Sequence, residues 1–72
     1  MRDELIVKLK NHIVLIDDEC FELACEISRL LNSNDESIKQ DGRNLIIRLL
    51  DNWDNISESY REIFRDLVSA AG

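Results

Sequence analysis

The sequence contains no proline, and its only glycines are Gly42 and Gly72. β-Sandwiches and barrels need turn residues at short intervals, so this scarcity argues against them and favours helices. It also excludes a glycine-rich phosphate-binding loop, whose backbone N–H groups cradle a phosphate. No apolar run approaches the ~20 residues that cross a membrane. We therefore expect an all-α fold without a membrane-spanning segment.

Positive charge is also scarce, with 9 Lys and Arg against 15 Asp and Glu and a formal net charge of −6. No Lys or Arg lies between His12 and Ser28. Nucleic-acid binding depends on cations that neutralise phosphates, so we do not expect this chain to bind nucleic acid directly. A partner recognised by charge should be basic. A solvated acidic face that aids solubility is the alternative. Because the N-terminus has acids where a signal peptide is basic, we expect a soluble, cytoplasmic protein.

Residues that could carry chemistry are few. Cys20 and Cys25 lie five positions apart, about 140° around a helix, and cannot bridge, so we expect Cys20 to be a buried structural thiol. The only histidine, His12, has no partner at the spacing of a nucleophilic triad. We predict no catalytic residues, no cofactor and a protein that is not an enzyme.

Two stretches imitate ion-binding motifs. IVLIDDE, residues 13–19, has the look of a strand whose terminal acids hold Mg²⁺, but the phosphate loop that such a site needs is missing. NSNDESIKQDGRN, residues 32–44, has Ser37 where a calcium loop needs glycine and Arg43 where it needs a bidentate acid. Carboxylates on one helix face also lack the Glu-x-x-His pairs of dinuclear bundles. We therefore predict no metal site.

Apolar residues recur at three- and four-residue steps in four segments, which predicts amphipathic helices at about residues 2–15, 18–32, 34–53 and 57–70. Their inner faces are predicted to carry Leu5, Ile6, Leu9, Ile13 and Ile16; Cys20, Leu23, Ala24, Ile27, Leu30 and Leu31; Ile38, Gly42, Leu45, Ile46, Leu49, Leu50 and Trp53; and Ile56, Tyr60, Ile63, Phe64, Leu67, Val68 and Ala71. The short connections predict one domain over residues 1–72, a small antiparallel bundle of four helices.

Polar residues between the segments predict where helices end. We expect Asp17 or Asp18 to cap the second helix, because a short carboxylate accepts the free N–H groups of a first turn. Asn32 suits a left-handed helix end. Ser33 and Glu36 fit the S-x-x-E capping box at the start of the third helix.

The two glycines have different predicted roles. Gly42 costs about 1 kcal/mol in a helix interior relative to alanine. Either the third helix breaks there, or the glycine lets another backbone approach closely; we favour a continuous helix. Gly72 lies where the last helix would stop.

Some apolar residues remain once the inner faces are assigned, among them Val7, Val14, Phe21 and Ile47. Exposed together, such residues usually indicate a partner or a dimer. Trp53 could plug the end of the bundle or act as a binding hot spot. We therefore predict a small non-catalytic protein–protein interaction module that binds a basic protein partner or a second copy of itself. Its predicted partner-binding residues are Asp17, Asp18, Glu19, Glu22, Glu26, Phe21, Ile47 and Trp53.

Residues 42–72, GRNLIIRLLDNWDNISESYREIFRDLVSAAG, resemble helical accessory segments of large helicase-type proteins. The resemblance covers less than half of the chain and includes no catalytic motif. It implies an alternative function, a helical accessory domain of a larger nucleic-acid-processing ATPase whose catalytic parts lie outside this chain.

Overall fold

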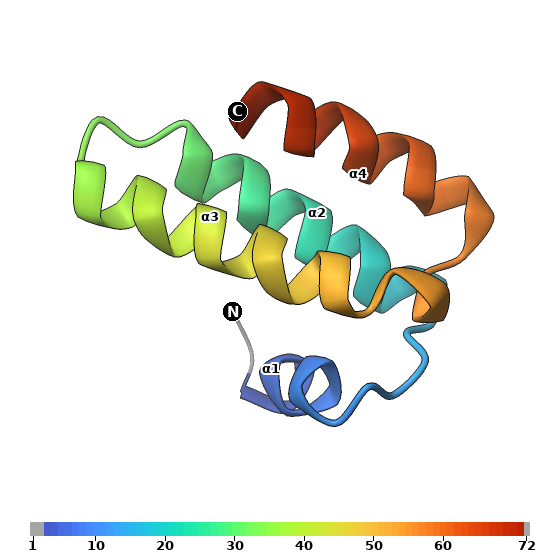
Figure 1. Ribbon diagram of the computed structural model, residues 1–72. Helices are drawn as coiled ribbons and strands as arrows, with labels where there is room; N and C mark the ends of the chain where they lie inside the picture. Colours follow the sequence, from blue (N-terminus) through green and yellow to red (C-terminus); the bar gives the residue numbers. More distant parts are fainter. Residues whose placement is uncertain (1–2, 72) are drawn as a thin grey trace.

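The computed structural model describes residues 3–71, and within them every regular element is a helix (Figure 1). The elements are α1 (Asp3–Lys10), α2 (Asp17–Leu31), α3 (Glu36–Asp51), the 3₁₀ turn η1 (Trp53–Asn55) and α4 (Glu58–Ala71). The all-α prediction is confirmed. The predicted helix start at Arg2 and stop at Gly72 lie outside the described residues.

Helix α2 lies at the centre of the molecule and packs against both α3 and α4, while α1 packs against α3. Figure 1 shows α2 and α3 running in opposite directions, as the short turn between them requires, with α1 on the side away from α4. The same view shows α4 running in the direction of α2. The antiparallel arrangement that we expected therefore describes the α2–α3 pair, whereas α2 and α4 are parallel.

The core takes residues from all four helices and from two connections. Leu15 and Ile56, which belong to the connections, are as buried as residues of the helices. The aromatic rings of Tyr60 and Phe64 pack with their centroids 6.4 Å apart. The buried cluster consists of Leu5, Leu9, Leu15, Cys20, Leu23, Ile27, Ile46, Leu49, Ile56 and Phe64.

Helix α1 ends at Lys10, five residues before the predicted end. The backbone turns at His12, whose φ of 56° is left-handed. The His12 N–H donates to the Leu9 carbonyl (3.4 Å) and the Ile13 N–H to the Lys8 carbonyl (3.0 Å), which is the hydrogen-bond pattern of a Schellman helix end.

Residues 13–16 consequently form a non-helical connection, and the prediction that Ile13 and Ile16 complete the apolar face of the first helix is wrong. Both side chains are exposed. Leu15 is buried instead, and its N–H donates to the Asn55 carbonyl (3.2 Å). A run rich in β-branched residues has little helical preference of its own, so this distant contact decides its conformation.

Replacing His12 by glycine is expected to stabilise the domain by about 0.5–1 kcal/mol, because glycine adopts a left-handed φ without the steric cost that a Cβ adds. Chemical denaturation of the two proteins measures the difference. His12→Ala keeps the Cβ and serves as the control, which should gain nothing. A His12→Gly variant no more stable than His12→Ala would contradict the expectation.

The start of α2 differs from the predicted cap. The helix follows Ile16, and neither Asp17 nor Asp18 caps it. Glu19, only 6% exposed, accepts a hydrogen bond from the Ile16 N–H (3.0 Å) and pairs with the Lys8 ammonium group (2.5 Å). Because α1 ends early, Lys8 lies close enough to hold this carboxylate, and the pair ties α1 to the first turn of α2.

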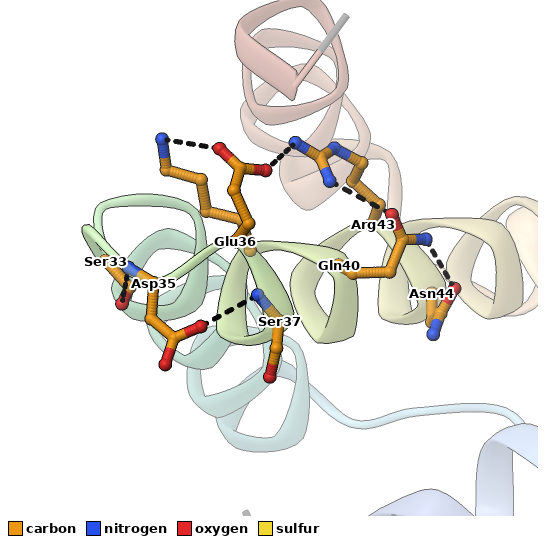
Figure 2. A network of polar contacts seen from close by, with 8 residues as sticks. Ser33, Asp35, Glu36, Ser37, Gln40, Arg43 and Asn44 are labelled. Carbon is orange, nitrogen blue, oxygen red and sulfur yellow. Dashed lines mark hydrogen bonds and ion pairs between the residues drawn. The ribbon is translucent and has the colours of Figure 1, made fainter.

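The turn between α2 and α3 is short, as predicted, but its caps differ (Figure 2). Asn32 has a right-handed φ of −84°, so the predicted left-handed end is wrong. Asp35, not Ser33, caps α3 by accepting the Ser37 N–H (2.8 Å), while the Ser33 hydroxyl accepts the Asp35 N–H (3.1 Å). Glu36 is thereby left to pair along the helix surface, with Lys39 (3.7 Å) and Arg43 (3.5 Å).

Helix α3 is continuous through Gly42, as we favoured. A Cβ built on this glycine would lie 3.1 Å from the Leu30 Cβ and 3.1 Å from the Leu31 Cδ2, closer than ordinary van der Waals contact. Gly42 therefore lets α2 and α3 approach each other closely.

Asn52 joins the ends of two helices. It is 2% exposed, and its side-chain Nδ2 donates to the Leu9 carbonyl (2.9 Å) and the Arg48 carbonyl (2.8 Å). These acceptors lie in the last turns of α1 and α3, where carbonyl groups lack partners within their own helix. One buried amide thus satisfies both helix ends and fixes their relative position.

Candidate protein-binding groove

A groove of about 510 Å³ runs between α2 and α4 and is open to solvent. Most of its lining side chains are apolar. Polar groups come from Ser28, Arg29 and Asn32, towards the C-terminal end of α2. The residues that line it are Phe21, Ala24, Cys25, Ser28 and Arg29 from α2, Asn32 directly after that helix, and Tyr60, Ile63 and Leu67 from α4.

Two large apolar side chains in this groove are exposed, Phe21 at 61% and Ile63 at 47%. Cys20, the residue before Phe21, is buried in the core, whereas the Phe21 side chain lies at the surface and lines the groove. We expected Ile63 on the inner face of its helix, and that expectation is wrong, because Phe64 takes the position that points into the core. Fully burying a side chain of either type contributes about 1.5–3 kcal/mol, so covering the exposed parts of both would contribute on the order of 2 kcal/mol.

An acidic recess adjoins the groove at Phe21. Phe21, Cys25 and Arg29 line both hollows, and the recess adds the carboxylates of Asp18, Glu22 and Glu26. Glu26 forms an ion pair with Arg29, whose hydrogen bonds lower the pKa of the Glu26 carboxyl. This pairing offsets the positive charge of Arg29, so the recess remains acidic overall.

The two cysteines lie in different surroundings, and both thiols are free. Cys20 is fully buried, and burial raises its thiol pKa; the charges of Asp17 and Glu19 also raise it, although a backbone hydrogen bond with Ser57 opposes them. The predicted burial of Cys20 is confirmed. Cys25 is exposed on the groove wall.

Four of the eight predicted partner-binding residues come together beside the groove: Asp18, Phe21, Glu22 and Glu26. Asp17 is exposed at the first position of α2. Glu19 is buried against Lys8 and does not contribute to an exposed acidic face, which corrects its predicted placement.

Ile47 and Trp53 lie apart from the groove. Ile47 is 58% exposed on α3, which contributes no residue to the groove. Trp53 is half-buried in η1 and packs against the core, with the Arg65 guanidinium carbon 5.7 Å from its ring centroid. This placement agrees with a plug at the end of the bundle, stabilised by a cation–π contact.

The sequence-based reasoning missed the contribution of α4 to this surface, namely Tyr60, Ile63 and Leu67. These residues and Phe64 recur at i, i+3, i+4 and i+7, which makes one apolar face of ordinary width. The sequence therefore contains no signal that separates the groove residues of this face from Phe64, which enters the core.

Other kinds of site find little support in residues 3–71. Among them, no three His, Cys, Asp or Glu side chains come together in a way that could hold a metal ion. No helix in that range has the length and apolar character needed to cross a membrane.

Neither the curated proteins nor the solved structures gave a match to this chain. A family model did match, one described as the anti-bacteriophage protein B N-terminal domain, over residues 1–72. Because the match extends over the whole sequence, the chain belongs to the anti-bacteriophage protein B N-terminal domain family.

Proposed function

We propose that this domain is a non-catalytic protein–protein interaction module of an anti-bacteriophage protein and that it binds its partner through the α2–α4 groove. The observation that carries the proposal is the exposure of Phe21 and Ile63 in one hollow between two helices. Large apolar side chains gathered on the surface of a small domain usually mark an interaction site. The family description supplies the biological setting.

The groove suits a protein partner better than a small molecule. It is open along its length, whereas small-molecule sites usually enclose most of the ligand surface. Aromatic anchors such as Phe21 and Tyr60 are enriched where proteins meet. The acidic recess beside Phe21 adds electrostatic selectivity, because complementary charge steers a partner and suppresses wrong ones.

The experiment uses the complete anti-bacteriophage protein that carries this domain, expressed in a phage-sensitive bacterial host. The double substitution Phe21→Ser with Ile63→Ser is expected to abolish protection in a plaque assay while protein abundance stays unchanged. Ile47→Ser with Leu50→Ser removes comparably exposed apolar side chains from α3 and is expected to leave protection intact. Full protection by the groove variant would overturn the proposal.

The alternative function is a helical accessory domain of a larger helicase-type nucleic-acid-processing ATPase. The family description names an N-terminal domain, which supports the part of this alternative in which further domains belong to the same protein. The reading frame beyond Gly72 tests the accessory-domain alternative against the interaction module. A phosphate-loop motif downstream would favour the accessory domain, and a stop codon directly after Gly72 would exclude it.

A further inference from the structure

The shape of the groove indicates what kind of segment could occupy it. Its α2 wall extends from Phe21 to Asn32, about 16 Å along a helix at 1.5 Å per residue. The two helices that form its walls run in the same direction along the chain (Figure 1). A third helix of about three turns matches this length and can insert its side chains between those of α2 and α4.

The charges at the edges of the groove indicate what that helix carries. On the α2 side, Asp18 and Glu22 flank Phe21. On the α4 side, exposed Asp66 lies one turn after Ile63 and directly before Leu67. An occupant with lysine or arginine on both sides of its apolar face would place cations opposite these acids.

The same charges argue against a second copy of this chain as the occupant. A two-fold contact through the groove would bring each acidic edge towards its own copy, in a protein whose net charge is already −6. Like charges facing each other across an interface disfavour association.

We propose that the α2–α4 groove binds an amphipathic helix of a partner protein, with large apolar side chains at i, i+4 and i+7 flanked by Lys or Arg. This inference rests on the proposed function and specifies the chemistry of the partner. Phe21 and Ile63 would contact the apolar face of the bound helix, and Asp18 and Asp66 would pair with its flanking cations.

A yeast-displayed library of helical peptides with randomised positions tests the proposal. The intact domain is the bait, and enriched peptides are then synthesised and their affinities measured by fluorescence anisotropy. We expect enriched sequences to combine apolar residues at i, i+4 and i+7 with net positive charge. Phe21→Ala and Ile63→Ala are each expected to weaken binding about fivefold, whereas Ile47→Ala on α3 should have no effect.

The charge contribution has its own matched control. Asp18→Asn with Asp66→Asn is expected to weaken binding about fivefold at low salt, with the difference shrinking as salt screens the charges. Asp41→Asn with Asp51→Asn makes the same change in net charge on α3 and should leave the affinity unchanged. Circular dichroism of every variant establishes that each is folded.

Three distinguishable outcomes would overturn the proposal. Enriched peptides without a positive bias, but sensitive to Phe21→Ala, would refute the basic helix and leave the proposed interaction module standing. Failure to enrich any peptide, or binding that ignores both Phe21→Ala and Ile63→Ala, would refute the groove as a docking site altogether. A concentration-dependent dimer in sedimentation that Phe21→Ala dissociates would identify a second copy as the occupant.

Discussion

Replacing Asn52 by aspartate is expected to destabilise the domain by about 3–5 kcal/mol at neutral pH, because the change removes donors and buries a charge at one position. The Asn52 Nδ2 now donates to two carbonyl oxygens, those of Leu9 and Arg48. A carboxylate has no donor and would face both oxygens. It would also lie at the C-terminal ends of α1 and α3, where the helix dipole is negative.

The effect should depend on pH in a defined direction. Burial and the facing carbonyls raise the pKa of the introduced carboxyl above its unfolded value of ~3.9. A group whose folded pKa is raised favours the folded state at low pH and loses that contribution as pH rises through the folded pKa. The stability gap between Asn52→Asp and the unchanged protein should therefore widen from pH 4 to pH 7. Urea denaturation at several pH values measures it.

Asn52→Ala is the matched control, because it removes the same two hydrogen bonds without adding a charge. It should cost about 2–3 kcal/mol, with the same loss at every pH. Equal losses for the aspartate and alanine variants across this pH range would contradict the buried, donor-only role that we assign to Asn52.

Replacing Gly42 by leucine is expected to cost about 1–2 kcal/mol. A Cβ alone would already lie 3.1 Å from side-chain atoms of Leu30 and Leu31, so a branched side chain must push α2 away from α3. Overpacking of this kind typically costs 1–3 kcal/mol, and a gain of about 1 kcal/mol in helix propensity offsets only part of it. Thermal or urea denaturation provides the measurement.

Gly42→Ala separates the two terms. Alanine recovers the helix propensity and adds only the Cβ, so the net change should stay within about 1 kcal/mol of zero. Asn44→Leu, an exposed site on the same helix, controls for leucine itself and should be nearly neutral. A leucine at position 42 that is as well tolerated as one at position 44 would show that α2 and α3 are not in close contact there.

Periodicity predicted the number of helices, and the ends of α2, α3 and α4 to within two residues. It failed at α1, because the conformation of residues 13–16 depends on a hydrogen bond from the Leu15 N–H to the Asn55 carbonyl, 40 positions along the chain. Local signals contain no trace of that contact. The cap of α3 was mispredicted because Ser33 and Asp35 can both serve and the packed geometry selects Asp35. The cap of α2 was mispredicted because Glu19, held by Lys8, binds the Ile16 N–H from within the helix.

Of the two walls of the candidate groove, the sequence predicted the α2 wall but not the α4 wall. Phe21 lay outside the buried stripe of α2, and the nearby acids were evident from the charge pattern, so one wall could be proposed from the sequence. The other wall could not, because its position depends on how α4 rotates about its own axis. That rotation is fixed when Phe64 enters the core, which leaves Ile63 at the surface.

The connection before α2 (residues 11–16) and the one before α4 (residues 52–57) lie far apart in the sequence, but hydrogen bonds join them. The Asn55 Nδ2 donates to the His12 carbonyl (3.0 Å), next to the hydrogen bond between Leu15 and Asn55, and the Asn52 amide holds the end of α1 nearby. These segments are interlocked parts of the scaffold, so neither can lengthen without displacing the other. The turn at residues 32–35 carries no such tie among its hydrogen bonds, all of which are local. We therefore expect the turn at residues 32–35 to tolerate an inserted tag or the new termini of a circular permutant. Insertions in either of the two hydrogen-bonded connections should disrupt the fold.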